Sequence, residues 1–195
     1  VHRTYYAAHP QPPRGQLVIT IFDMIHELFP QSFRKDDPVH ERKRRCVEAA
    51  DRLICISHST ARDLQRLCDV PAHKIVVTHL GFSSAFSQVA SPPAPANRRP
   101  YLLYVGHRDG YKNFGRVLQA YAASARLRAD FSLLAFGGLP FGAGERERIA
   151  QLGLSSEQVR HQSGSDAEQA RVYAGAHLFV YPSEYEGFGI PPLEA

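Results

Sequence analysis

A loop with two cations, Arg108 and Lys112, is the first segment whose side chains could do chemistry. It begins at Gly106, directly after an apolar run typical of a strand, and ends at Asn113, which can cap the helix expected next. Glycine lets a backbone approach a ligand closely, and an arginine fork beside a lysine point charge can hold a diphosphate. The loop therefore fits either a diphosphate site or an ordinary basic turn in contact with solvent.

A second loop of this kind covers Glu186–Glu194, near the C-terminal end of the chain. Gly187 and Gly189 favour a tight loop after a strand. Pro191 and Pro192 suit the first turn of a helix, because proline has no amide hydrogen to leave unpaired there. Loop amides that precede such a helix can point at phosphate oxygens. We therefore expect a second anion-binding segment here.

The two glutamates of this second loop suit hydroxyl groups. Glu194 would lie in the first turn of the helix, where its carboxylate can accept from vicinal hydroxyls such as those of ribose. Glu186 precedes the glycines and can accept from the hydroxyls of a sugar. Two alternatives stay open: a glycine turn with two surface glutamates, and the acid and nucleophile of a glycosidase. Arg108 and Lys112 argue against the glycosidase, which needs no diphosphate site.

Two other segments have conspicuous compositions. The stretch Gly137–Gly144 is rich in glycine but lacks G-x-G-x-x-G spacing and follows the second strand of its series. We expect an ordinary strand-to-helix turn, and a loop whose glycines approach the ligand is the alternative. The basic run Arg42–Arg45 spreads over more than one face of a helix. A solvated face is the expectation for this run, and contact with an anionic membrane surface is the alternative.

Composition limits the class of partner and the compartment. The chain has 195 residues, a net charge of +4 and a pI near 9.1, which suits an anionic partner, but it lacks the aromatic-basic pattern of nucleic-acid binders. No apolar run reaches the roughly 18 residues of a membrane span. Cys46, Cys55 and Cys68 form no C-x-x-C motif, so free thiols in the cytoplasm are expected. Neither H-E-x-x-H nor paired Cys/His ligands occur, so we expect no metal site.

The elements around these loops alternate between strand and helix. In the first half we expect a strand over 17–22, a helix over 38–50, a strand over 52–56, a helix over 60–68 and a strand over 74–78. Ser57 or Ser59 offers an N-cap for the second of these helices. This β-α-β-α-β order indicates a parallel, doubly wound sheet.

Residues 82–100 change character, because a Pro/Ala/Ser stretch breaks both periodicities, and we interpret them as a linker. In the second half we expect strands over 101–105, 131–136, 159–162 and 177–181 and helices over 113–124, 145–152 and 166–174. The sequence therefore predicts two α/β domains, 1–81 and 101–195. The chain starts without methionine and ends about one turn into a helix, so we expect truncation at both ends.

The two glutamates that flank seven residues, E-G-F-G-I-P-P-L-E, resemble the E-x7-E element of retaining glycosyltransferases of family 4, which have the GT-B fold. Y-V-G-H-R-D-G-Y-K-N looks like the phosphate-binding segment of that family. The strand–Ser–helix element of the family is similar to A-D-R-L-I-C-I-S-H-S-T-A-R-D-L here. The segment that leads out of the family's N-terminal domain is similar to V-P-A-H-K-I-V-V-T-H-L-G-F. H-R-T-Y-Y and T-I-F-D-M-I-H-E-L-F-P look like the mannosyltransferase-like branch of bacterial surface-polysaccharide synthesis.

The resemblance implies a role for each matching residue. It assigns the donor diphosphate to Arg108 and Lys112, the donor sugar to Glu186, the ribose to Glu194, and phosphate contacts to the amides of Phe188 and Gly189, with Gly106 and Gly187 in the same loops. Many members of the family place a histidine where this chain has Phe22. The resemblance implies that the following residue, Asp23, orients the sugar or the acceptor. His26 is a weaker candidate for that role, because a capping or core role explains it equally.

The implied fold is GT-B, with two Rossmann-like domains that are both incomplete here. The implied reaction is sugar transfer from a nucleotide-diphosphate-sugar, with GDP-mannose as the first candidate, to a saccharide or lipid-linked saccharide hydroxyl with retention. Two fixed cations and loop amides would stabilise the leaving diphosphate without a metal or cofactor.

The enzyme would work in the cytoplasm or peripherally at the inner face of the membrane, and would not bind nucleic acid. We expect the isolated chain to be poorly soluble and inactive. The alternatives are a nucleotide-sugar epimerase of similar fold and a non-catalytic nucleotide or polyanion binder.

Overall fold

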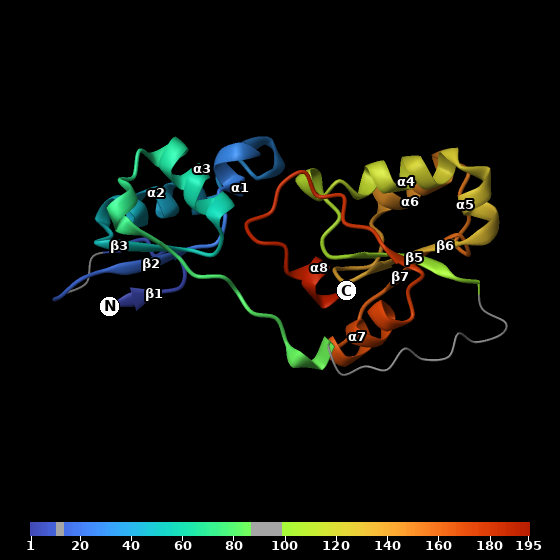
Figure 1. Cartoon of the computed structure of the whole chain (residues 1–195). Coiled ribbons are helices and arrows are strands. Elements are labelled where there is room, and N and C mark those ends of the chain that lie inside the picture. The colour runs from blue at the N-terminus through green and yellow to red at the C-terminus, as the bar shows by residue number, and fades with distance from the viewer. Residues whose placement is uncertain (11–13, 87–98) are drawn as a thin grey trace. The chain divides into compact units, whose positions relative to one another are not determined.

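The chain divides into two compact units. The computed structural model describes residues 1–10, 14–86 and 99–195 (Figure 1). The first unit consists of Val1–Gly81 together with Tyr185–Gly189, and the second of Phe82–Glu184 together with Ile190–Ala195. Each unit contains a parallel sheet of its own.

The sheet of the first unit has four parallel strands whose spatial order follows the chain, β1-β2-β3-β4. These are β1 His2–Arg3, β2 Val18–Ile21, β3 Arg52–Cys55 and β4 Ile75–Val77. The helices between them are α1 Ile25–Leu28, α2 Val39–Ala49 and α3 His58–Cys68, with 3₁₀ helices at Pro30–Ser32 and Ala72–Lys74. All three α-helices lie on one side of the sheet (Figure 1).

This arrangement corrects the expectation of a doubly wound sheet in the first half. Right-handed crossovers that all step in the same direction place their helices on the same face. The core accordingly lies between one sheet face and α2 and α3, where Ile19, Leu53 and Cys55 pack with Cys46 and Leu64. Each of these side chains is fully buried.

The second unit also has four parallel strands, but in the order β7-β6-β5-β8. These are β5 Tyr101–Val105, β6 Ser132–Phe136, β7 Val159–Gln162 and β8 Leu178–Phe179. Its helices are α4 Phe114–Ala123, α5 Ala125–Asp130, α6 Ala143–Gln151, α7 Asp166–Ala174 and α8 Ile190–Glu194, with 3₁₀ helices at Ser84–Phe86 and Gly110–Lys112.

Helices cover both faces of this second sheet. Helices α4, α5 and α6 lie on one side and α7 on the other (Figure 1). Alternate strand residues therefore enter two separate cores. Tyr104 and Leu133 pack with Tyr121 of α4, whereas Leu103 packs with Tyr173 of α7.

Several local expectations can be compared directly with the elements. Ser57 is the N-cap of α3, and its hydroxyl accepts a hydrogen bond from the Thr60 amide at 3.0 Å. Among the strands and α-helices of the described residues, β1, α1 and α5 have no counterpart in the sequence-based assignment. Within the predicted linker, residues 87–98 lie outside the described part of the chain. Phe86, which is described, packs against Tyr173 of the second unit with ring centroids 5.9 Å apart.

Candidate functional site

The carboxyl ends of β5 and β8 form the point in the second sheet where the strand order reverses. The loops that leave these two strands are hydrogen-bonded to each other: the Glu184 amide donates to the Tyr111 carbonyl at 2.9 Å, and the Asn113 side-chain amide to the Pro182 carbonyl at 3.3 Å. In doubly wound sheets, ligands bind in the crevice beside such a reversal. The strand order therefore places the candidate site at the loop that contains Lys112.

The loop after β5 depends on backbone conformations that favour glycine. Gly106 has φ +122° and Gly110 has φ +51°, both in the left-handed half of the map. Asn113 also has positive φ, at 59°, and occupies the N-cap position of α4. Its side chain makes no capping hydrogen bond, contrary to the expectation, because its amide group is turned toward the Pro182 carbonyl.

Arg108, predicted as a diphosphate ligand, is held by partners within the second unit. Its Nε donates to Glu145 at 2.6 Å, Nη1 to the Gly137 carbonyl at 3.0 Å and Nη2 to the Leu139 carbonyl at 2.6 Å. Its side chain is only 7% exposed. Burial opposes ionisation of Glu145, but the hydrogen bonds from Arg108 and the Gly142 amide outweigh it and lower the pKa of Glu145.

The glycine-rich stretch Gly137–Gly144 leads from β6 into α6, as expected of a strand-to-helix turn, and it also accepts hydrogen bonds from Arg108. Gly137 and Gly138 have φ +91° and +66°, and a Cβ on Gly138 would lie 3.4 Å from Arg108 Nη1. Arg108 thus ties this stretch to the loop after β5.

Lys112 lies in the same loop as Arg108 but in a different environment. Its side chain is half-buried, and its Nζ lies 5.3 Å from the centre of the Tyr111 ring, within range of a cation–π contact. Its backbone is part of the short 3₁₀ helix Gly110–Lys112. The second cation of the predicted pair therefore sits at the sheet reversal itself.

Glu194, predicted to bind ribose, ends helix α8 in the same unit. Its Oε2 accepts from the Gln169 side-chain amide at 3.1 Å and from the Tyr173 hydroxyl at 3.3 Å. Burial raises the pKa of Glu194, and Asp166 adds to that rise, while the two hydrogen bonds oppose it. Sequence analysis missed Gln169 and Tyr173, although their four-residue spacing places both on one face of a helix.

The segment Tyr185–Gly189 belongs to the first unit, where it packs beside the start of α3. The Gly187 carbonyl accepts from the Ser57 hydroxyl at 2.5 Å and from the Thr60 hydroxyl at 3.1 Å. A Cβ built on Gly187 would overlap the Phe22 carbonyl oxygen and lie 3.1 Å from Asp23 Cβ. The site glycine and Asp23, far apart in sequence, are therefore neighbours in this unit.

The rest of this segment has partners in the first unit as well. The Tyr185 hydroxyl donates to Asp63 at 2.8 Å, and the Phe188 ring lies 5.6 Å from that of His79. The predicted site residues are therefore divided between the units. The first unit contains Glu186, Gly187, Phe188 and Gly189, and the second contains Gly106, Arg108, Lys112 and Glu194. The E-x7-E element is divided between the two units.

Asp23 accepts the Ile25 amide at 3.0 Å and lies 3.6 Å from Lys43, whose ammonium also binds Glu27 at 2.8 Å. The Lys43 side chain is 1% exposed. Nearby, His26 stacks on Phe33 with ring centroids 3.8 Å apart. Burial and the charge of Lys43 lower the pKa of His26, which favours the core role considered for it.

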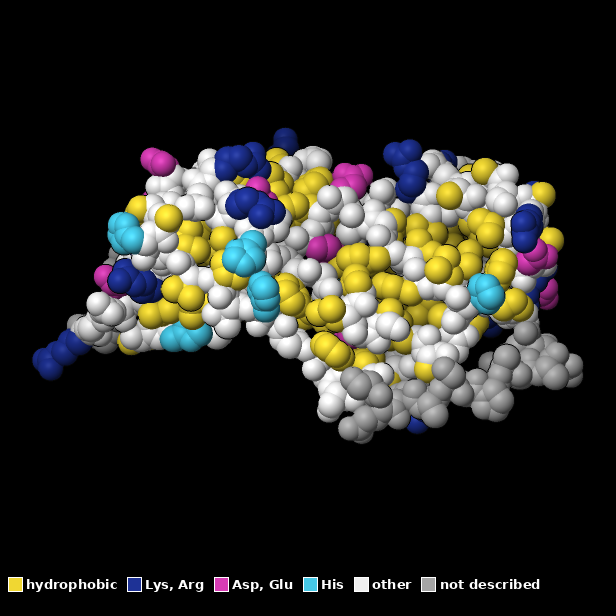
Figure 2. All heavy atoms as spheres, in the orientation of Figure 1, with side chains coloured by type: hydrophobic (Ala, Val, Ile, Leu, Met, Phe, Trp, Pro, Cys, Tyr) yellow, Lys and Arg dark blue, Asp and Glu magenta, His cyan; other side chains and the backbone are white. Residues whose placement is uncertain are grey.

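The basic run Arg42–Arg45 is not the uniformly solvated face that we expected. Lys43 is buried, because it shares a helix face with Cys46 and Val47, which enter the core. Arg44 and Arg45 pair with Glu41 at 2.9 and 2.8 Å. On the face shown in Figure 2, lysines and arginines lie apart from one another rather than in one continuous patch.

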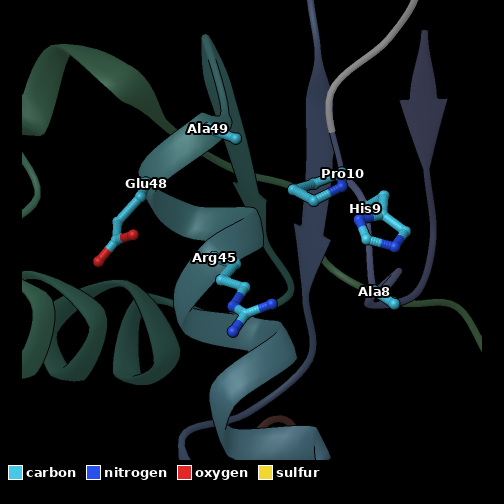
Figure 3. Close-up of a pocket in the computed structure, with 6 residues that line it drawn as sticks. All are labelled: Ala8, His9, Pro10, Arg45, Glu48 and Ala49. Carbon is cyan, nitrogen blue, oxygen red and sulfur yellow. The ribbon is translucent and has the colours of Figure 1, made fainter.

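A cavity of about 390 Å³ lies in the first unit between α2 and the segment after β1 (Figure 3). It is lined by Ala8, His9, Pro10, Arg45, Glu48 and Ala49, which include none of the predicted site residues. Figure 3 shows its two charged side chains on successive turns of α2. Both take part in ion pairs along that helix, Arg45 with Glu41 and Glu48 with Arg44.

The described residues also bear on metals and membranes. Across 1–10, 14–86 and 99–195, no group of three or more His, Cys, Asp or Glu side chains is arranged to hold a metal ion. Within the same ranges, no helix is both long and apolar enough to cross a membrane. All three cysteines are free thiols.

Two family models match the chain. Residues 89–195 match Glycosyl transferases group 1, and residues 2–86 match Glycosyltransferase Family 4. The chain therefore belongs to the family of glycosyl transferases group 1. This membership confirms the resemblance inferred from the E-x7-E element and the loop after β5.

Curated relatives are consistent with that membership. O-antigen chain mannosyltransferase B of Escherichia coli is 28% identical over 94% of this chain and 51% of its own length. MMP alpha-(1->4)-mannosyltransferase of Mycolicibacterium hassiacum is 29% identical over 80% of this chain and 37% of its own length. The chain spans about half the length, or less, of these relatives.

Solved structures support the fold. WaaG, a glycosyltransferase involved in lipopolysaccharide biosynthesis, has a TM-score of 0.70 at 18% identity, over 94% of this chain and 57% of its own. The pneumococcal O-GlcNAc transferase GtfA, solved with UDP and GlcNAc, has a TM-score of 0.61 at 14% identity, over 92% and 35%. The expected GT-B fold class, with two Rossmann-like parts and parallel sheets, is confirmed.

Proposed function

We propose that this chain is part of an enzyme that transfers mannose from a nucleotide-diphosphate-mannose, GDP-mannose first among them, to a hydroxyl of a saccharide or lipid-linked saccharide. Family membership makes it a glycosyltransferase, and the mannosyltransferases among its relatives support mannose as the sugar. The observation that carries the proposal is the reversal between β5 and β8, which gathers Lys112 and the neighbouring loop at one sheet edge.

The proposed reaction breaks the bond between the anomeric carbon and the diphosphate oxygen and forms a bond from that carbon to the acceptor oxygen. The acceptor proton passes to the leaving phosphate, so no separate base is needed. The diphosphate gains negative charge as the bond breaks. A fixed ammonium such as that of Lys112 stabilises this charge without a metal ion, because it needs no reorganisation during the step. Retention of configuration is part of the proposal.

Each site residue has a role in this scheme. Glu194 binds the ribose hydroxyls, and the amides of Phe188 and Gly189 approach phosphate, as the family resemblance implies. Glu186 contacts the donor sugar, and Asp23 orients the sugar or the acceptor. Arg108 reaches the diphosphate by exchanging the Glu145 carboxylate for a phosphate oxygen, since both anions accept from the same guanidinium fork. The free cysteines of the chain suit an enzyme that works in the cytoplasm.

Binding to the full chain tests the proposal. Titration with GDP, UDP and ADP should give the tightest complex with GDP, and Lys112→Ala should weaken that complex about tenfold or more, because a charge-assisted contact to phosphate is lost. Arg116→Ala, an exposed cation on the neighbouring helix α4, is the matched control and should bind normally. If the Lys112→Ala variant bound GDP as tightly as the native chain does, the proposed role of Lys112 would be wrong.

Turnover of the complete enzyme tests the chemistry. Lys112→Ala should lower kcat about a hundredfold, which is the effect of removing one preorganised charge-stabilising group elsewhere. Nuclear magnetic resonance of the new linkage should show the anomeric configuration of the donor. An inverted linkage would overturn retention, and conversion of the donor without any acceptor would instead favour a nucleotide-sugar epimerase.

A further inference from the structure

Glu194 is the last residue of a helix that is too short to fix the orientation of the Glu194 side chain. Helix α8 covers five residues, Ile190–Glu194, and isolated helices of this length have little intrinsic stability. Both hydrogen bonds to the Glu194 carboxylate, among the residues that the structure describes, fall on Oε2 and come from helix α7. The orientation of the carboxylate is therefore set by α7.

Helix α7 is a rigid support for those two donors. It begins with a capping box in which Ser165 and Glu168 satisfy each other's backbone amides. Tyr173 is buried, and its ring lies 5.3 Å from that of Phe179 on β8. Gln169 is one helical turn earlier on the same face, so both donors approach Glu194 from one side.

We propose that Gln169 and Tyr173 are positioning residues that hold Oε2 of Glu194, turn Oε1 toward the donor ribose, and thereby make the site selective for ribonucleotides over deoxyribonucleotides. This inference rests on the proposed function, which places ribose at Glu194. The carboxylate can only accept hydrogen bonds, so it favours binding of a ligand that has hydroxyl donors.

The chemistry of the two donors suits this role. Burial raises the pKa of the Tyr173 phenol, and the Glu194 charge adds to the rise, so the phenol remains protonated and keeps donating. The Gln169 side-chain amide is a donor at every pH. A ligand without the ribose hydroxyl leaves Oε1 without its partner, which is the situation that gives hydroxyl-reading sites their selectivity.

The experiment measures affinities of the full chain for GDP, 2′-deoxy-GDP and 3′-deoxy-GDP. The native chain should prefer GDP by about tenfold or more over at least one deoxy analogue. Tyr173→Phe, which keeps the ring and loses only the hydroxyl, should reduce that preference about threefold, as should Gln169→Met. Arg171→Ala, an exposed residue of the same helix, is the control and should leave the preference unchanged.

The ratio of affinities separates positioning from a purely structural role. Loss of stability alone would weaken GDP and its deoxy analogues together, so an unchanged preference in both Tyr173→Phe and Gln169→Met would overturn the inference. A native chain that binds GDP and both deoxy analogues equally would overturn it too, while the proposed function would stand. Failure to bind any nucleoside diphosphate would instead defeat the proposed function, and the inference with it.

Discussion

The two sheets of the molecule use the same β-α-β units but order their strands differently. In the first unit the order β1-β2-β3-β4 follows the chain, and the α-helices share one face. In the second unit the order β7-β6-β5-β8 reverses beside β5, and helices cover both faces. Only a reversal makes two crossovers leave in opposite directions and opens a crevice between their loops. This difference between the two sheets is the reason to propose a diphosphate contact for Lys112 in the second unit rather than for a cation in the first unit.

The two units also differ in how they hold a buried cation. In the first, Lys43 is enclosed by the carboxylate of Glu27, the Asp23 carbonyl and the Tyr6 ring. In the second, Arg108 divides its donors between Glu145 and the carbonyls of a glycine-rich stretch. A lysine closed in by core residues supports the fold, whereas for Arg108, which ends in loop carbonyls, we propose a change of partner when the donor binds.

The largest effect that we expect comes from Lys43→Met. The substitution leaves Glu27, whose side chain is 10% exposed, without its buried partner, and losing one member of a buried ion pair costs about 3 to 5 kcal/mol. Urea unfolding measures the loss of folding free energy, and hydrogen exchange of the amides in β2 and α2 is a second measurement of it. Arg44→Ala on the same helix removes two exposed pairs, with Glu41 and Glu48, and should change little. Equal effects of the two variants would mean that Lys43 has no special role.

Gly187→Ala should have the next largest effect. The new methyl group would meet the Phe22 carbonyl oxygen, which is backbone and cannot turn away. Forcing extra volume into a packed site typically costs about 1 to 3 kcal/mol, so Tyr185–Gly189 should exchange its amide hydrogens faster. Gly115→Ala, on helix α4 with open space around it, should instead be neutral or stabilising. Unchanged exchange at Tyr185–Gly189 would contradict the packing described here.

Glu145→Gln tests whether Arg108 can change partners. Removing the charge of Glu145 weakens its hold on the guanidinium, so GDP should bind about threefold to tenfold more tightly if phosphate takes its place. Calorimetric titration at low salt measures this change. Glu147→Gln, an exposed neighbour on α6, should not alter the affinity. Weaker binding to the Glu145→Gln variant would show that Arg108 acts only through the loop that it holds.

The smallest effect concerns the pH dependence of Glu194. Its pKa is raised above 4.5 in the folded chain, so the folded state holds the proton more tightly than the unfolded state does. Stability from this group is therefore fully present below the unfolded pKa and falls as pH rises through the folded pKa. Glu194→Gln should match the native chain at about pH 4 and exceed it near pH 7, as judged by urea midpoints. The opposite order would mean that the carboxylate is stabilised in its ionised form.

The strands were largely predictable, because short apolar runs such as residues 101–105 and 131–136 are buried on both faces of a parallel sheet and admit few other structures. Strand order was not, because local sequence does not say which neighbour a strand takes. The place of β8 beside β5 therefore appeared only in the structure. Helix α5 was missed because Ser124, its N-cap, follows directly on the preceding helix.

The candidate site shows the same division. Residue types suggested Lys112 and Glu194 as candidates, since cations and carboxylates after strands suggest ligands. They did not show that Arg108 is already paired with Glu145, because that contact spans 37 positions, with strand β6 between the two residues. Nor did they reveal Gln169 and Tyr173, whose amide and phenol attract attention only once Glu194 lies beside them.

The assignment of Tyr185–Gly189 to the first unit has a practical consequence for dissecting this protein. The chain passes between units three times, after Gly81, after Glu184 and after Gly189, so no single cut yields two whole parts. A protein that ends at Gly81 would lack Tyr185–Gly189, the segment in which Gly187 bonds to Ser57 and Thr60 and Tyr185 bonds to Asp63. Chimeras between relatives should therefore exchange Tyr185–Gly189 together with the first unit, although it is encoded more than a hundred codons downstream of Gly81.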